Sequence, residues 1–418
     1  MKSKYKGFLQ SLGPGLLMAG AAIGVSHLIQ STRAGADYGF ALVWAVVLAN
    51  IFKYPFFEFG PRYAAATGKS LLDGYFKLGK WAMTIFLIFT LLTMFTTEAA
   101  LVLTTASLAG KLFGLELTPV WWSVIVVTVC MAILIPGRYP LLDKIMKVII
   151  SLLALSTVIA VFSLLIYGSP GVSDNLKPAV WTVTGISFVV ALMGWMPSIV
   201  DISVWHSLWT LEREKQTKHR ATMREALFDF NLGYISTSIL ALVFLSLGAL
   251  LMFGKGESFS NNGVEFAGQL VSLYTRSLGD WAGPVIIIAA FTTIFTTTLT
   301  VTDAYPRVLQ KSTELIFPGL SKFLKTESFY FVFMIILALA AIMIISFLQS
   351  GIKSMVDLAT TLAFLTTPVL SFINYKVITD KHVPENSRPK TWLRILSWCG
   401  LIFWTGFSLI FIWIRFIA

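Results

Sequence analysis

Long apolar segments recur along almost the whole of this 418-residue chain, and they constrain its fold more than any other feature. Segments of about 20 residues, the length that an α-helix needs to cross a bilayer, begin near Gly13, Ala41, Trp81, Pro119, Ile145, Gly185, Ala226, Ala282, Phe329, Met355 and Trp392. Hydrophobic residues make up 56% of the chain and charged residues 13%, which excludes a soluble domain of this length. The sequence therefore predicts an all-α, polytopic membrane protein with eleven transmembrane helices.

The distribution of basic residues predicts the orientation of these helices. With the N-terminus in the cytoplasm, 24 Lys and Arg residues fall on the cytoplasmic side and seven on the other. The seven are Arg33, Lys111, Lys177, Lys255, Arg276, Lys353 and Arg415. Cytoplasmic loops are enriched in Lys and Arg, so we expect a multi-pass protein of the cell membrane with an extracytoplasmic C-terminus. The net charge of +11 is then explained without nucleic acid. The partners that we expect are membrane lipid and a small ion or solute, with no obligate protein partner.

Two of the apolar segments are interrupted. The first contains Gly24-Val25-Ser26-His27, and the sixth contains Met196-Pro197-Ser198, where the proline removes a backbone donor. Backbone groups freed inside a membrane are tolerated where they line a cavity or are buried in protein. The simpler alternative is that Gly and Pro are common in membrane helices and are rescued by neighbouring helices.

The interrupted helices are five apart, which predicts two inverted five-helix repeats with a substrate site between the breaks. We place the repeats at about 10–168 and 180–378 and helix 11 at about 392–417, all within a single transporter domain, 1–418. An amphipathic segment, 261–279, is expected to lie as a helix on the outer surface.

Several short motifs resemble the Nramp family of proton-coupled divalent-metal transporters. They are Gly13-Pro14-Gly15, Ala34-Gly35-Ala36-Asp37-Tyr38-Gly39-Phe40, Leu48-Ala49-Asn50, Ala66-Thr67-Gly68, Phe113-Gly114, Met196-Pro197 and His206-Ser207. The resemblance implies a LeuT-type fold, alternating access and a metal site at the membrane midplane. Typical members read Asp-Pro-Gly-Asn at the first break, and the Asp, the Asn and the helix 6 Met bind the metal. Gly24, Val25, Ser26 and His27 occupy those positions here, so the carboxylate is absent and the chain resembles an outlying branch.

The candidate substrate-binding residues lie at the two breaks. They are Gly24, Ser26, His27, Gln30, Met196, Ser198 and Asp201, of which Met196, Asp201 and His27 are the candidate metal ligands. Thioether and imidazole ligands favour transition metals over Mg²⁺. Asp201 is either a ligand or a cap on the second half-helix, and His27 is either a ligand, a proton carrier or a hydrogen-bonded packing residue.

Three ionisable residues inside the helices are candidates for charge or proton coupling: Lys53, Glu58 and Glu98. Such residues are expensive in a membrane and rarely face lipid. Lys53 is expected either to repel divalent ions as a fixed cation or to form an ion pair with Glu58, Glu98 or Asp201. The family resemblance places Glu98 where typical members have an Asp on the proton route; the alternative is a buried hydrogen-bonded partner.

We expect a secondary-active transporter that moves a divalent cation, Mn²⁺, Fe²⁺ or Mg²⁺, by alternating access, with possible proton linkage. The alternative is a transporter on the same frame that no longer carries divalent metal and moves another small solute, with Lys53 as an internal cation. The chain contains no H-E-x-x-H, G-x-S-x-G or P-loop motif. We therefore expect no enzymatic activity and no cofactor, the divalent metal being a possible substrate.

Overall fold

The computed structural model describes residues 7–8, 10–135, 139–168, 178–320, 327–348 and 351–416, and these residues form helices and no strands. Seven helical stretches among them are long and apolar enough to cross a membrane. One of the seven, Ser26–Thr67, combines the second half of the predicted helix 1 with helix 2. Three shorter apolar helices, Pro119–Leu134, Ser151–Tyr167 and Val183–Gly194, complete the eleven predicted spans.

The first predicted repeat contains α2 (Pro14–Ala22), the π-helix η1 (Ser26–Ser31), α3 (Thr32–Tyr38), the 3-10 helix η2 (Gly39–Leu42), α4 (Val43–Thr67), α5 (Leu71–Leu78), α6 (Lys80–Phe113), α7 (Pro119–Leu134) and α8 (Tyr139–Tyr167). Here α2 and α3 are the two halves of helix 1, and α5 is a short helix between two spans. The α8 helix begins six residues before the expected Ile145, because Tyr139 to Lys144 continue the helix ahead of the apolar window.

The second predicted repeat contains α9 (Val183–Gly194), α10 (Ile202–Thr217), α11 (Met223–Leu251), α12 (Gly263–Leu278), α13 (Ala282–Ile316), the 3-10 helix η3 (Pro318–Leu320), α15 (Glu327–Leu348) and α16 (Ile352–Thr379). The 3-10 helix η4 (Glu385–Ser387) and α17 (Thr391–Phe416) follow. The predicted amphipathic helix is confirmed as α12, whose N-cap Asn262 accepts hydrogen bonds from the N–H groups of Val264 and Glu265. The repeat boundaries stay predictions.

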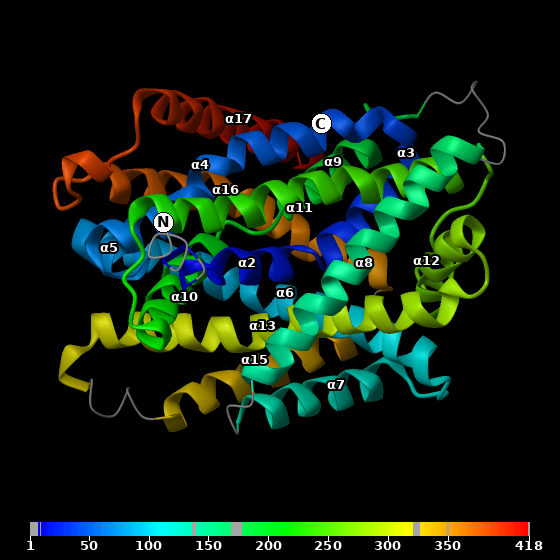
Figure 1. Ribbon diagram of the computed structural model, residues 1–418, viewed down its shortest axis with the longest axis horizontal. Coiled ribbons are helices and arrows are strands. Elements are labelled where there is room, and N and C mark those ends of the chain that lie inside the picture. Colours follow the sequence, from blue (N-terminus) through cyan, green and yellow to red (C-terminus); the bar gives the residue numbers. More distant parts are fainter. Residues whose placement is uncertain are drawn as a thin grey trace.

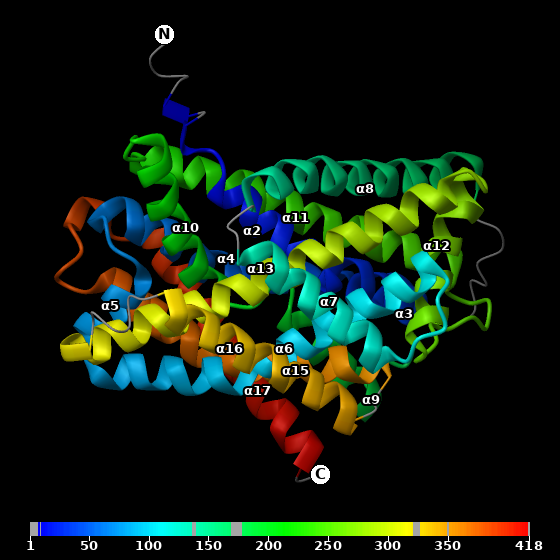
Figure 2. The same cartoon turned by 90° about the horizontal axis from the view of Figure 1, so that it is seen from below.

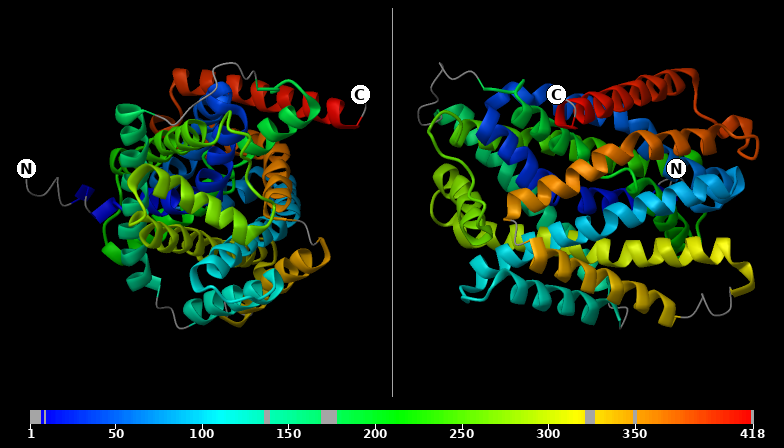
Figure 3. Two further views of the ribbon diagram at one scale, coloured as in Figure 1. Left: turned by 90° about the vertical axis from the view of Figure 1, so that its right-hand side faces the viewer. Right: turned by 180° about the vertical axis from the view of Figure 1, so that it is seen from behind.

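The broken helices lie in the interior, and α7 and α17 lie on opposite sides of the bundle (Figures 1 and 3). The α11 helix packs against α2, η1 and α3, whereas α16 packs against α9, and α10 packs against α4. The short helix α5 and α12 lie at opposite ends of the long axis (Figures 1 and 2). Each break is therefore held by long, continuous helices on several sides.

Close backbone contacts explain why glycine stands at particular positions in this bundle. A Cβ atom on Gly15 of α2 would lie 2.0 Å from the Asp229 carbonyl oxygen of α11. A Cβ atom on Gly194 would lie 1.9 Å from the Thr360 carbonyl oxygen of α16. Neither space admits a methyl group, so these glycines set how closely each broken helix approaches its neighbour.

Candidate transport site

The first break falls where the sequence predicts it. The α2 helix ends at Ala22, and Ile23 leaves the helical conformation with φ −77° and ψ 63°. Gly24 lies against α13, where a Cβ atom would come within 2.7 Å of Thr297 Oγ1. The chain then continues as the wider turns of η1. The Gly24 carbonyl, a candidate for substrate contact, accepts from the N–H groups of His27 and Leu28.

The second break spans residues 195–201 between α9 and α10. The Met196–Pro197 peptide bond is cis, and α10 begins again at Ile202. A helix that ends inside the bundle leaves carbonyl groups without intrahelical partners at its C-terminal end. The carbonyl groups at the end of α9 therefore need partners from elsewhere in the chain.

Lys53 of α4 fills the carbonyl end of α9. Its Nζ donates to the carbonyl oxygens of Met193 at 2.9 Å, Gly194 at 2.7 Å and Ser198 at 3.1 Å. The side chain is fully buried, and Nζ also lies 5.3 Å from the centre of the Trp404 ring. Three acceptors match the three hydrogens of an ammonium group, whereas a neutral amine would direct a lone pair at one carbonyl.

The expected ion pair of Lys53 with a carboxylate is not formed, because all three hydrogens go to the backbone. Glu58 instead pairs with Arg62 one turn further along α4, at 2.6 and 2.8 Å. Glu98 of α6 accepts from Thr302 of α13 at 2.5 Å, and its other oxygen is buried without a hydrogen-bond partner among the described residues. The two glutamates therefore belong to separate networks.

Ser26 and His27 contact each other and neighbouring backbone carbonyls, with Ser26 Oγ 2.8 Å from His27 Nδ1. The Ser26 hydroxyl lies 2.5 Å from the Ala22 carbonyl and 3.3 Å from the Pro197 carbonyl, which links the two breaks. His27 Nδ1 lies 2.8 Å from the Ala22 carbonyl, and Nε2 lies 2.9 Å from the Thr237 carbonyl of α11. Both ring nitrogens thus lie within hydrogen-bond distance of protein oxygens, which agrees with the packing alternative for this histidine.

Gln30 takes part in a polar cluster in the second half of the first broken helix. Its amide nitrogen donates to Asp357 and Thr360 of α16, and its amide oxygen accepts from Arg33. Arg33 binds Asp357 with two nitrogens, and its guanidinium lies 4.9 Å from the Phe188 ring of α9. Sequence reasoning counted Arg33 only as an external charge and did not consider Asp357. Their shared position on the predicted extracytoplasmic side of helices 1 and 10 was the available signal.

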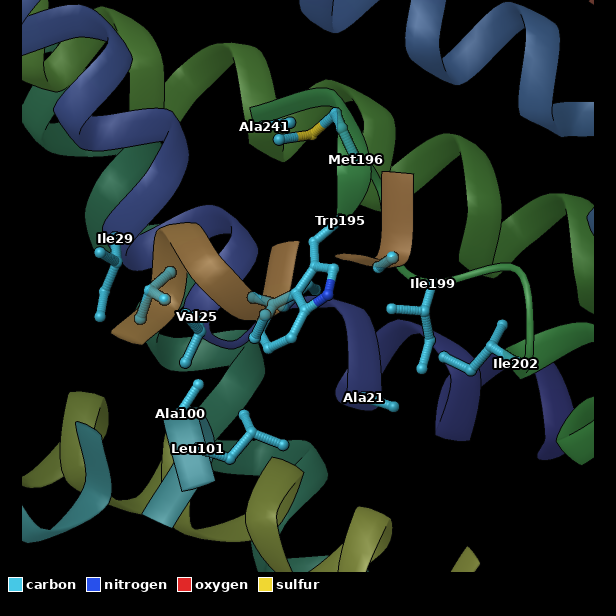
Figure 4. Packing of buried hydrophobic residues seen from close by; sticks show 14 of the residues in the cluster. Ala21, Val25, Ile29, Ala100, Leu101, Trp195, Met196, Ile199, Ile202 and Ala241 are labelled. Atoms are coloured by element: carbon cyan, nitrogen blue, oxygen red, sulfur yellow. The ribbon is translucent and has the colours of Figure 1, made fainter. Parts of the chain in front are cut away.

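The three candidate residues of the second break, Met196, Ser198 and Asp201, also have different contacts. Met196 is fully buried and lies beside Ala241 in the view of Figure 4. Ser198 contributes its carbonyl oxygen to Lys53. Asp201 makes no side-chain cap on α10, so the capping alternative is wrong; instead it accepts from Thr90 of α6 at 3.3 Å. In the part of the chain that the structure describes, no group of three or more His, Cys, Asp or Glu residues could hold a metal ion.

Apolar side chains pack around the two breaks. Val25 of the first break, Ala100 and Leu101 of α6, and Trp195 and Ile199 of the second break belong to one buried cluster (Figure 4). Sequence reasoning missed Trp195, although it directly follows the glycine that ends α9. The arrangement is a buried lysine amino group on one half-helix end beside an apolar centre.

Comparison with known proteins identifies the family to which this chain belongs. The sequence model of the Nramp family, described as natural resistance-associated macrophage protein-like, matches residues 15–414. The chain belongs to the Nramp family. The protein called uncharacterized protein PM0681 of Pasteurella multocida is 37% identical over 414 residues, which are 98% of this chain and 94% of that protein. The divalent metal cation transporter MntH of Staphylococcus saprophyticus is 25% identical over 410 residues, which are 94% and 89% of the two chains.

Solved structures confirm the fold of this Nramp-family chain. A histidine-to-alanine variant of the Eremococcus coleocola manganese transporter superposes with a TM-score of 0.72 at 16% identity, over 97% of this chain and 86% of that one. Mhp1, a nucleobase-cation-symport-1 family transporter with bound bromovinylhydantoin, gives a TM-score of 0.59 at 16% identity, with coverage of 96% and 92%. The predicted LeuT-type architecture with broken helices 1 and 6 is confirmed, and these neighbours are transporters rather than enzymes. The protein is a multi-pass membrane protein, whereas the sidedness of its termini stays a prediction.

Proposed function

We propose that this Nramp-family chain is a secondary transporter that moves a small anionic or zwitterionic solute rather than a divalent cation, with Lys53 as a fixed internal cation. The observation that carries the proposal is the triple hydrogen bond of the Lys53 ammonium to the carbonyls of Met193, Gly194 and Ser198. Oxygens freed by a broken helix are the groups that coordinate cations in transporters of this architecture. Here a cation attached to the chain already occupies three of them.

Electrostatics supports the exclusion of divalent ions from this centre. A divalent ion roughly 5 Å from the ammonium would be repelled by about 7 kcal/mol at an effective dielectric constant of about 20. Acidic ligands would have to offset this cost. Asp201, the candidate carboxylate of the second break, instead accepts a hydrogen bond from Thr90.

A second candidate function, transport of Mn²⁺ or Fe²⁺, is favoured by family membership and by the buried thioether of Met196. Thioethers suit softer transition metals. Proton linkage through Glu98 would accompany this function, since one of its oxygens is buried and has no hydrogen-bond partner in the part of the chain that the structure describes.

Mn²⁺ uptake into proteoliposomes that contain the purified chain separates the two functions. The Eremococcus coleocola manganese transporter, reconstituted in the same way, serves as the positive control. We expect no saturable Mn²⁺ entry and no calorimetric Mn²⁺ binding at millimolar concentration. Saturable entry would overturn the proposal and favour the second candidate.

Lys53→Met tests the proposed cause, because it removes the charge at similar side-chain length. We expect Mn²⁺ binding to rise relative to the wild-type chain. Thermal melting in detergent identifies a variant that has failed to fold. A folded Lys53→Met chain with unchanged Mn²⁺ affinity would remove Lys53 as the reason for metal exclusion.

A further inference from the structure

The indole of Trp195 presents a buried hydrogen-bond donor that the fold leaves unused. Trp195 is the first residue after α9, and 4% of its surface is exposed. Its Nε1 is buried and has no hydrogen-bond partner in the described part of the chain. Buried indole N–H groups usually have an acceptor, so this one calls for a partner that the described chain does not supply.

The residues around Trp195 do not provide that acceptor. Val25, Ala100, Leu101 and Ile199 share its buried cluster, and in Figure 4 the indole nitrogen lies on the side of the ring toward Ile199. The donor therefore points along the second break, toward the segment that leads into α10. Apolar side chains there exclude water and strengthen any hydrogen bond that forms.

The backbone of this segment offers donors, whereas several of its acceptors are already used. Lys53 takes the carbonyls of Met193, Gly194 and Ser198, and the Ser26 hydroxyl reaches that of Pro197. Among the described residues, the N–H groups of 198–200 have no backbone partner. They precede the N-terminal, electropositive end of the sixteen-residue helix α10.

We infer that Trp195 Nε1–H donates to the carried solute, and that this solute is a small monocarboxylate with an apolar body. The inference rests on the proposed function and names the substrate class of the same site. A carboxylate matches a set of N–H donors beside one fixed positive charge. An apolar body matches Val25, Leu101 and Ile199, which would solvate a multiply charged anion poorly. Asp201 does not occupy these donors with a side-chain cap.

Isothermal calorimetry with the purified full chain and two probes, sodium benzoate and sodium butyrate, tests the inference. Trp195→Phe removes the N–H group and keeps an aromatic ring. Trp205→Phe is the matched control, because Trp205 of α10 also carries a buried Nε1 without a partner in the described chain and packs against Tyr305. We expect at least one probe to bind the wild-type chain, and Trp195→Phe to weaken its binding about ten- to a hundredfold. Trp205→Phe should bind like the wild-type chain, and benzyl alcohol should not bind.

Three results would overturn the inference: binding of neither carboxylate to the wild-type chain, equal binding by Trp195→Phe, or equal losses in the two Phe variants. Thermal melting confirms that both variants fold. Mn²⁺ uptake in matched proteoliposomes judges the proposed function separately. If the wild-type and Trp195→Phe chains bind the carboxylate equally well, the inference fails but the proposed function does not. Saturable Mn²⁺ uptake would overturn the proposed function itself.

Discussion

Arg33 and Asp357 join the second half of the first broken helix to α16 by two hydrogen bonds, of 2.7 and 3.0 Å. The Arg33 side chain is 6% exposed and the Asp357 side chain 34% exposed. Gln30 binds both residues, and Arg33 also covers the Phe188 ring of α9. This cluster connects three helices at one end of the bundle, so these helices can move apart there only after the pair separates.

Asp357→Asn removes the charge of this pair and keeps the shape of the side chain. Breaking a fully buried pair costs about 3–5 kcal/mol, and partial exposure of Asp357 lowers the expected loss to about 1–2 kcal/mol. Thermal melting in detergent measures the change. Lys215→Gln is the control, because the Lys215–Glu212 pair is mostly exposed and should contribute almost nothing. Equal melting temperatures for Asp357→Asn and the wild-type chain would contradict the expectation.

Gly15→Ala tests the backbone contact between α2 and α11. The new methyl group would lie 2.0 Å from the Asp229 carbonyl oxygen, and the facing Gly233 leaves no space for α2 to shift. Overpacking of this kind costs about 1–3 kcal/mol or more, so we expect a lower melting temperature and yield. Gly406→Ala is the control, since a Cβ atom there meets nothing within 4 Å. A Gly15→Ala chain as stable as Gly406→Ala would show that α2 moves freely against α11.

Asp201→Asn separates the two candidate substrates. For a carboxylate, removal of a negative charge near the second break should leave affinity unchanged or raise it. For a divalent metal, loss of the only candidate carboxylate ligand at the breaks should abolish binding. Calorimetry with benzoate and with Mn²⁺ on the same variant distinguishes these outcomes, and Thr90→Val controls for loss of the Thr90 hydrogen bond alone. Reduced benzoate affinity in Asp201→Asn would contradict the proposed substrate class.

Asp380 lies in the loop between α16 and α17, and we expect its carboxylate to make the free energy of unfolding depend on pH. The N–H group of His382 donates to its carboxylate at 3.1 Å, and ring Nδ1 lies 2.6 Å from the same oxygen. These bonds hold the pKa of Asp380 below its ordinary value. A lowered folded pKa stabilises the protein above the unfolded pKa of about 3.9, and this stabilisation is lost as the pH falls through the folded pKa.

We therefore expect Asp380→Asn to lower stability at pH 6–8 by less than about 1 kcal/mol, because the Asp380 side chain is 39% exposed. The difference from the wild-type chain should begin to shrink at about pH 4 and disappear as the pH falls below the folded pKa of Asp380. Melting temperatures across this range measure it. Glu385→Gln, at an 87% exposed side chain, should show no comparable pH dependence. A difference that persists unchanged at acidic pH would exclude the carboxylate as its cause.

The sequence predicted the helices and both breaks because these depend on local chemistry. Apolar length marks the spans, Pro197 removes a backbone donor, and Gly24 permits the close approach to Thr297 that a side chain would block. The sequence did not predict the partners of Lys53. Its carbonyl acceptors lie 140 to 145 residues away along the chain, and a backbone oxygen carries no signature in the sequence.

The polar cluster at Arg33 was missed for a related reason. Its partner Asp357 is 324 residues away, so their pairing depends on a tertiary arrangement that brings distant parts of the chain together. Trp195 was missed because an aromatic residue in an apolar helix is usually a packing residue of the core, and the sequence does not distinguish it from the others. Only the three-dimensional structure shows that its N–H group has no acceptor among the described residues.

The position of Lys53 also has a consequence for energy coupling. A bound metal or sodium ion has a reservoir on each side of the membrane, and its concentration difference can drive a transport cycle. A lysine amino group that is part of α4 has no such reservoir and cannot be diluted into either solution. Its effective concentration at the carbonyls of α9 is set by the fold alone. While Lys53 occupies these three oxygens, no metal or sodium ion binds them, so under the proposed function such a driving ion would bind elsewhere in the molecule.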